Sequence, residues 1–240
     1  MPPIALSELR HVACSQFSSL LAQDHHRRLT LQRTGLLGGS FNPAHGGHRR
    51  IALGAIAMLR LDELWMMVSP GNPLKDAAVD MAPLAARMAS ARRIARHAPI
   101  KVTAIERNLH TRYTVETLAS LVRRYPKRRF IWLMGADNLA DFHRWRQWRK
   151  IAMTVPIAVI ARPGYNGAAR TGPAWAWLRR FVRPESQAQR WTNWRPPALV
   201  LLRFVPDPAS ATRIRRGNPG WHVSHNPIVR RDPVTRRLIA

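Results

Sequence analysis

The sequence predicts an α/β fold in which a doubly wound parallel sheet carries helices on both of its faces. Two observations predict this class. Short segments that are apolar throughout, as strands buried on both faces are, alternate along the chain with segments of helical periodicity. The 240 residues are 46% hydrophobic and 22% charged, which is close to the average of globular proteins. Right-handed crossovers between such strands build an open, Rossmann-like sheet.

Six apolar segments are predicted to be the strands. In chain order they are residues 35–39, 64–68, 100–105, 130–134, 155–161 and 199–205. The first segment runs into a glycine turn, and the loop 69–73, which contains two prolines, ends the second.

Helices are predicted between the strands. They cover residues 43–60, 83–97 and 114–125 and a tryptophan-rich stretch after residue 135. Pro43 lies near the start of the first helix, where its fixed φ is tolerated. The second helix would bury an apolar face, and Thr114 is expected to be the N-cap of the third.

The chain is expected to have one main domain with two appendages. Residues 1–33 form an N-terminal extension that is either disordered or helical, residues 34–217 form the main domain, and residues 218–240 form an irregular C-terminal tail. An insertion rich in proline, tryptophan and arginine, between residues 165 and 197, is also expected to be irregular.

Several classes of protein are excluded by composition. Cys14 is the only cysteine, so the chain has no intramolecular disulfide and no cysteine-built zinc site. Its apolar stretch at 151–161 is shorter than the roughly 20 residues that a membrane span needs. We therefore expect a cytoplasmic protein with no membrane partner.

The net charge of +26 is unusually high, with 39 basic residues against 13 acidic ones. Two interpretations are open: a nucleic acid or phosphorylated small molecule as partner, or a compositional preference for arginine on solvated surfaces. The arginines occur as pairs dispersed along the whole chain rather than as one basic block. This dispersion favours the second interpretation and argues against a nucleic-acid partner.

The segment 38–48 contains the clearest chemical signal. A predicted strand ends at Gly38 and Gly39, whose small size lets backbone N–H groups approach a ligand, and a helix N-terminus follows, which favours an anion. His45 and His48 are three residues apart and therefore lie on the same side of the first turn. Their imidazoles can donate hydrogen bonds to phosphate oxygens. A third ligand is missing nearby, so no metal site is predicted.

These residues resemble a known family. His45-Gly46-Gly47-His48 is similar to the first signature of the nucleotidyltransferase superfamily, and the segment 210–215 is similar to the second. Three further segments, 112–118, 135–145 and 161–165, resemble bacterial nicotinate-nucleotide adenylyltransferases in particular. The resemblance extends over residues 34–217, which would be a nucleotidyltransferase domain.

The resemblance implies an activity in NAD biosynthesis. The adenylyl group of ATP would move to nicotinate mononucleotide with the help of Mg²⁺, giving nicotinate adenine dinucleotide and pyrophosphate. The mononucleotide phosphate would attack the α-phosphorus of ATP directly.

The resemblance also implies the site residues. The expected catalytic residues are His45, His48, Lys75 and Arg215. The expected ATP-binding residues are Gly38, Gly39, Ser40, Phe41, His45, His48, Gly135, Asp137, Ser210, Thr212 and Arg215. The expected mononucleotide-binding residues are Asn42, Lys75, Tyr113, Thr114, Trp145 and Arg162.

The sequence leaves several alternatives open. The acceptor could be nicotinamide mononucleotide or phosphopantetheine instead, and a basic nucleic-acid-binding protein is a further alternative. Arg112 stands where the family often has a small residue, and the tail after 217 lacks the usual helical pattern. Whether the chain forms a homo-oligomer is also open.

Overall fold

The computed structural model describes residues 31–71, 81–161, 166–203, 210–225 and 230–239. Residues Arg33–Ala240 form one compact unit, which holds the helices and, apart from Gln32 at its start, the sheet. The predicted N-terminal extension lies outside the described residues as far as residue 30. Two of the predicted site residues, Lys75 and Arg162, also lie outside them.

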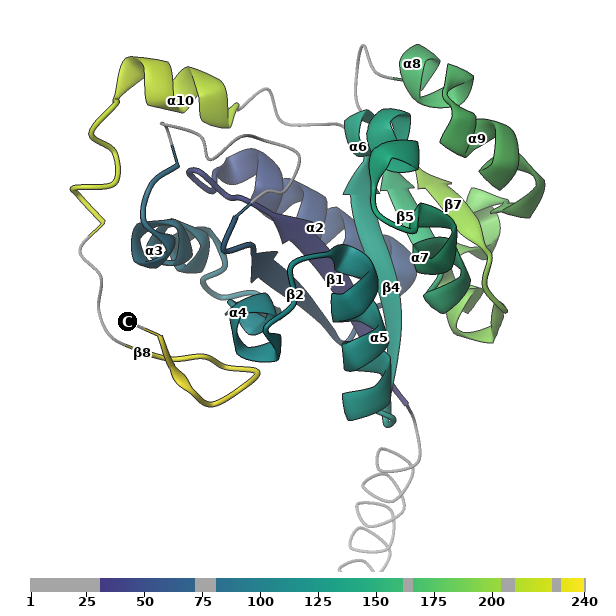
Figure 1. The fold of residues 1–240 in the computed structure, drawn as a ribbon, viewed down its shortest axis with the longest axis horizontal. Coiled ribbons are helices and arrows are strands. Elements are labelled where there is room, and N and C mark those ends of the chain that lie inside the picture. Colours follow the sequence, from purple (N-terminus) through teal and green to yellow (C-terminus); the bar gives the residue numbers. More distant parts are fainter. Residues whose placement is uncertain (1–30, 72–80, 162–165, 204–209, 226–229, 240) are drawn as a thin grey trace, which may run out of the picture. The chain divides into compact units, whose positions relative to one another are not determined.

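In the described part of the chain, seven strands form one sheet (Figure 1). They are β1 (Gln32–Gly39), β2 (Glu63–Val68), β3 (Ile100–Thr103), β4 (Arg128–Gly135), β5 (Ile157–Ile160), β6 (Val182–Arg183) and β7 (Leu199–Leu202). Their order is β3-β2-β1-β4-β5-β7-β6, and the pairs on either side of the β1–β4 junction are parallel. Strands are added outward in one direction from β1 and in the other from β4, so the predicted doubly wound fold is confirmed.

Helices connect the strands and cover both faces of the sheet (Figure 1). In chain order they are α2 (Gly46–Leu59), α3 (Leu84–Ile94), α4 (Ile105–Leu109), α5 (Thr114–Arg124), α6 (Ala136–Asp141), η1 (Phe142–Arg144), α7 (Trp148–Thr154), α8 (Asn166–Thr171), α9 (Pro173–Leu178), η2 (Arg179–Phe181), η3 (Glu185–Asn193) and α10 (Ala211–Gly217).

The sheet separates two hydrophobic cores, because successive residues of a strand point to opposite faces. In β1, Leu37 belongs to one core and Leu36 to the other. Helices α2 and α3 contribute side chains to the core of Leu37, and α5 and α7 contribute to the core of Leu36. Burial on both faces explains why the strands are apolar throughout.

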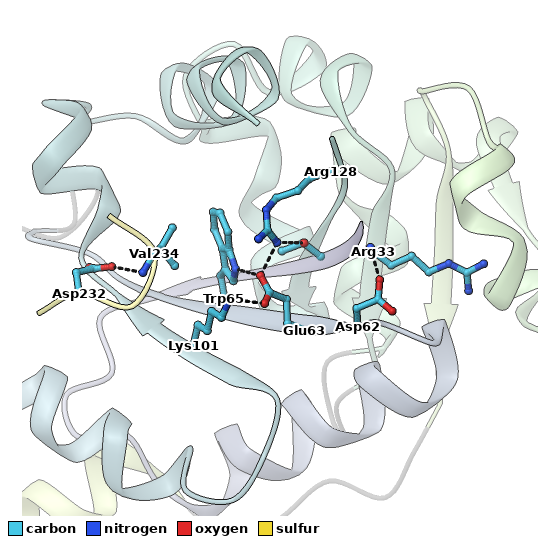
Figure 2. A network of polar contacts seen from close by, with 9 residues as sticks. Arg33, Asp62, Glu63, Trp65, Lys101, Arg128, Asp232 and Val234 are labelled. Atoms are coloured by element: carbon cyan, nitrogen blue, oxygen red, sulfur yellow. Dashed lines mark hydrogen bonds and ion pairs between the residues drawn. The ribbon is translucent and has the colours of Figure 1, made fainter. Parts of the chain in front are cut away.

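A buried polar network joins the amino ends of three strands (Figure 2). Glu63 of β2 accepts a 2.6 Å hydrogen bond from the Trp65 indole and pairs with Lys101 at 2.6 Å and with Arg128. Burial alone would raise the pKa of Glu63, but hydrogen bonds from Lys101 and Trp65 and the charge of Arg128 lower it. Ligands of parallel sheets bind at the carboxyl edge, so we assign this network a structural role.

Three local predictions differ from the structure. The first helix begins at Gly46 rather than near Pro43, because His45 caps it. The N-cap of α5 is Tyr113, so the prediction of Thr114 is wrong by one residue. The third strand ends at Thr103 instead of 105, because the chain turns there into the short helix α4.

Two segments expected to be irregular contain regular structure. The insertion at 165–197 includes α8, α9, η2, β6 and η3, most of which are too short for periodicity to reveal them. The tail includes an antiparallel pair, β8 (Arg230–Arg231) and β9 (Leu238–Ile239). Within the described ranges, no helix has the length and apolar character needed to cross a membrane.

Candidate active site

The loop between β1 and α2 lies at the carboxyl edge of the sheet, beside the β1–β4 switch point. Phe41 in this loop is buried with a positive φ of 46°, and its ring lies edge-on to the ring of His48, 5.0 Å between centroids. A Cβ atom at Gly38 would lie 2.6 Å from the indole of Trp132. Glycine is therefore required at position 38 by the approach of this indole.

His45 and His48 cap the first turn of α2 through their side chains. The Nδ1 atom of His45 accepts a hydrogen bond from the Gly47 N–H at 3.2 Å, and Nδ1 of His48 accepts one from the His45 N–H at 3.2 Å. The two rings are 3.9 Å apart between centroids. The spacing predicts that these imidazoles lie together, and the capping contacts show how the backbone holds them there.

This cap determines which ring nitrogen can donate. A neutral imidazole has one donor nitrogen and one acceptor nitrogen. Because Nδ1 accepts in both rings, the proton of each neutral ring is on Nε2. Both histidines are thereby oriented to donate from Nε2, the pattern needed to stabilise negative charge on a phosphate oxygen.

The second signature contacts the loop that leads into the first. Arg215 of α10 donates from its guanidinium to the backbone carbonyl of Asn42 at 2.6 Å, although the two residues are 173 positions apart. Ser210 is the N-cap of α10, and Thr212 in its first turn is exposed. The contact brings the second signature to the loop that precedes the first.

Arg87, a buried arginine that is not among the predicted site residues, supports the loop between β1 and α2. Arg87 of α3 is 1% exposed, and its guanidinium donates to the carbonyls of Ala82 at 2.9 Å, Ser40 at 2.9 Å and Ser69 at 2.7 Å. Ser40 follows β1 and Ser69 follows β2. Arg87 therefore links the loops at the ends of two adjacent strands. Helical periodicity could have revealed it, since residue 87 lies on the apolar face of its helix.

Two further contacts connect α3 and its preceding segment to the same loop. The Ala82 N–H donates to Oδ1 of Asn42 at 3.2 Å, and the Ala44 N–H donates to Oγ of Ser90 at 3.1 Å. Asn42 is consequently held at its side chain by Ala82 and at its carbonyl by Arg215. The loop is thus supported by a connected set of hydrogen bonds.

The carboxyl end of β4 carries a second group of predicted residues. Gly135 is the N-cap of α6, and a Cβ there would lie 2.2 Å from Oδ1 of Asp137. The half-buried ring of Trp145 lies edge-on to Trp132, 6.3 Å between centroids. Trp132 contacts Gly38 as well, so it connects the β4 residues to the end of β1.

Tyr113 and Thr114 lie at the start of α5, and both are half-buried. The Tyr113 N–H donates to a carboxylate oxygen of Glu116 at 3.4 Å. The guanidinium carbon of Arg146 lies 4.6 Å from the centre of the Tyr113 ring, a cation–π contact that orients this ring.

Comparisons with known proteins place the chain in a family. Residues 36–217 match the model of the cytidylyltransferase-like family. A probable nicotinate-nucleotide adenylyltransferase of Erythrobacter litoralis is 59% identical over 207 residues, which cover 86% of this chain and 94% of that one. The chain belongs to the nicotinate-nucleotide adenylyltransferase family. A relative of the same printed name in Cereibacter sphaeroides is 52% identical over 75% of this chain and 95% of its own.

Solved structures agree with the fold of this adenylyltransferase family member. The nicotinic acid mononucleotide adenylyltransferase of Plasmodium falciparum complexed with NaAD has a TM-score of 0.56 and 16% identity, and covers 77% of this chain and 83% of that chain. The complex of the same enzyme with APC gives a TM-score of 0.55. At this identity the likeness supports the fold, and the resemblance inferred from the motifs is confirmed by the bacterial relatives.

A titratable side chain in α4, Glu106, predicts a pH dependence of stability in this adenylyltransferase family member. Burial raises the pKa of Glu106 from 4.5 to about 7, with a hydrogen bond to Thr117 acting in the opposite direction. Because the folded pKa is the higher one, the folded protein binds more protons than the unfolded chain between these values. The contribution of protonated Glu106 to the free energy of unfolding is therefore complete below the pKa that this residue has in the unfolded chain. It is lost as the pH rises through the pKa that the residue has in the folded protein.

We therefore expect Glu106→Gln to gain stability relative to the parent protein as the pH rises from about 5 to about 8. Urea unfolding at both pH values measures the difference in the free energy of unfolding. Asp141→Asn, which changes an exposed carboxylate, serves as the control. Parallel pH profiles for the parent and Glu106→Gln would contradict the prediction.

Proposed function

We propose that this protein transfers the adenylyl group of ATP to nicotinate mononucleotide, forming nicotinate adenine dinucleotide and pyrophosphate. The observation that carries the proposal is the pair of capping histidines at the β1–α2 junction, joined through Asn42 to Arg215. Two imidazole donors, a helix N-terminus and a guanidinium at one loop are suited to a polyphosphate.

The reaction needs in-line positioning and charge stabilisation more than covalent chemistry by the protein. An oxygen of the mononucleotide phosphate forms a bond to the α-phosphorus of ATP. The bond between that phosphorus and the bridging oxygen breaks, and pyrophosphate leaves with the electron pair. His45 and His48 donate from Nε2 to the non-bridging oxygens of the α-phosphate, where negative charge increases in the transition state.

Residues from both strand ends and from α10 bind ATP in this proposal. The backbone of Gly38, Gly39, Ser40 and Phe41 lies along the phosphates, and Arg215, with Ser210 and Thr212, holds the β- and γ-phosphates. Gly135 and Asp137 contact the ribose at the adjacent strand. This division is supported by the location of β1 and β4 at the switch point, where ligands of such sheets bind.

The mononucleotide is assigned to the other side of the switch point. Trp145 stacks on the pyridine ring, and the N–H group of Thr114 binds the nicotinate carboxylate, with Tyr113 beside it in the mononucleotide site. Asn42 contacts the mononucleotide phosphate. Lys75 and Arg162, which lie outside the described residues, complete the set as cations for phosphate groups.

Mg²⁺ enters this proposal together with ATP. Among the residues that the structure describes, no cluster of three or more His, Cys, Asp or Glu side chains could hold a metal ion. Mg²⁺ ordinarily keeps several waters and is bound largely by substrate phosphates, so a MgATP substrate fits these residues. We place the reaction in the cytoplasm, in agreement with the single cysteine.

One assay compares the candidate acceptors. Purified protein is incubated with ATP and Mg²⁺ and with nicotinate mononucleotide, nicotinamide mononucleotide or phosphopantetheine, and the products are identified by mass. We expect the highest kcat/KM with nicotinate mononucleotide and equal amounts of dinucleotide and pyrophosphate. A product with phosphopantetheine alone, or polynucleotide binding without pyrophosphate release, would overturn the proposal.

A further inference from the structure

The C-terminal segment after α10 is anchored to the edge of the sheet by a buried carboxylate. Asp232 is 0% exposed, and its oxygens accept hydrogen bonds from the Thr103 hydroxyl at 2.8 Å and the Ala104 N–H at 2.9 Å, where β3 leads into α4. The N–H groups of Val234 and Thr235 donate to the same carboxylate (Figure 2 shows the first). A carboxylate removed from water in this way is stable only while these donors remain in place.

A second anchor lies nearer to α10. Trp221 is 3% exposed and forms a small apolar cluster with Ala82 and Ala86 of the α3 region. It follows α10 directly, since the Trp221 N–H donates to the carbonyl of Asn218, the C-cap of that helix. We call the described residues 218–225 and 230–239 the C-terminal strap; Figure 1 shows it leading from α10 past α3 to β8 near α4.

The strap contacts the segment that supports the candidate active site. Ala82, beneath Trp221, donates its N–H to the side chain of Asn42 and accepts at its carbonyl from Arg87. Arg215 of α10 contacts the carbonyl of the same Asn42. Trp221 is therefore adjacent to both partners of the hydrogen bond between Arg215 and Asn42. It packs against Ala82, which holds the Asn42 loop, and it follows the helix α10 that carries Arg215.

Helix α10 needs such anchoring. None of its described residues, 211–217, is buried, so the helix has almost no apolar packing of its own. A helix of seven residues is also far below the length at which helices are stable alone in water. The position of Arg215 must therefore depend on the segments that flank α10.

We propose that the C-terminal strap is a positioning element for the triphosphate of ATP, with Trp221 and Asp232 as its positioning residues. The strap holds α10 so that Arg215 stays on Asn42, and it covers Ala82 so that the loop after β1 keeps its shape. The inference rests on the proposed function for the identity of the ligand, but the coupling from strap to α10 can be measured separately.

Two variants with matched controls test the coupling. Trp221→Ala and Asp232→Ala remove the anchors; Val223→Ala, at a position 77% exposed, and Leu238→Ala, at a position 64% exposed, change the same segments without an anchor. We expect faster backbone hydrogen exchange over residues 211–217 in the two anchor variants, with β4 unchanged, and parent-like exchange in the controls. Parent-like exchange over 211–217 in both anchor variants would overturn the proposal. If Trp221→Ala does not fold, Trp221→Leu and Asp232→Ala provide the same comparison.

The ligand is tested with the Mg²⁺ complex of α,β-methylene-ATP by calorimetry. We expect Kd to rise about ten- to hundredfold in both anchor variants and to change less than about twofold in the controls, the size of effect that small misplacements of binding groups cause. For Trp221→Ala, KM for ATP should rise by a larger factor than KM for nicotinate mononucleotide, because the mononucleotide keeps its contacts with Trp145 and Thr114. If the parent protein binds the analogue but makes no dinucleotide, the proposed acceptor is refuted, whereas the positioning role of the strap is not. An unchanged Kd for the analogue in both anchor variants would refute the positioning role of the strap.

Discussion

His48→Ala is expected to lower kcat by about 100- to 1,000-fold, the usual cost of removing one donor to a developing oxyanion. The Nε2–H of His48 is oriented by the capping bond that its Nδ1 accepts from the His45 N–H. Alanine removes the donor and also the cap, so a loss of about 1 kcal/mol in the free energy of unfolding should accompany the loss of turnover. Pyrophosphate release and urea unfolding measure the two effects.

His48→Gln separates catalysis from capping. A glutamine at the third position of a helix can accept from the N-cap N–H, as in a capping box, so it replaces the contact that Nδ1 makes. We expect parent-like stability in this variant and a kcat that stays about 100-fold low. Near-normal turnover in His48→Gln would show that the histidine serves only as a cap, contrary to its proposed catalytic role.

Arg87→Met should give the largest loss of stability, about 2–4 kcal/mol, because it leaves buried carbonyl groups without donors. Its guanidinium donates to the carbonyls of Ser40 and Ser69, the residues that directly follow β1 and β2. Since Ser40 belongs to the loop proposed to bind ATP, KM for ATP should rise as well. Urea unfolding and initial rates at varied ATP give both quantities.

Arg93→Met is the matched control, since Arg93 is an exposed arginine of the same helix. We expect its stability to change by less than about 0.5 kcal/mol. Arg87→Lys keeps a positive charge but loses the planar fork that reaches several carbonyls at once, so it should recover only part of the stability. Equal unfolding midpoints for Arg87→Met and Arg93→Met would contradict the role assigned to this network.

Only some of the arginines that give the chain its high positive charge take part in the contacts described above. Many of the chain's arginines are exposed, as both interpretations of the charge expect. A few are used for defined contacts: Arg87 holds two loops, Arg215 contacts the loop that leads into the first signature, and Arg128 pairs with the buried Glu63. Sequence composition alone could not separate these from the rest, because it does not show which carbonyl or carboxylate an arginine meets in the folded chain.

Local signals along the chain were sufficient for the fold class and for the first part of the candidate site. Apolar runs revealed the strands of a sheet buried on both faces, and the spacing of His45 and His48 placed two imidazoles on one turn. Helix boundaries were less certain: whether α2 starts at Pro43 or three residues later depends on the cap that the histidines form.

Only the tertiary structure determined which distant groups meet. Arg215 contacts Asn42 across 173 positions, and Asp232 contacts Thr103 across 129. Neither pairing can be predicted from the local sequence. Hydrophobic periodicity and turn residues indicate which positions are buried, but a hydrogen bond between distant residues depends on where the folded chain places each partner. Helical periodicity could indicate that Arg87 is buried, but its partners Ser40 and Ser69, like the anchoring of the tail, became apparent only from the tertiary structure.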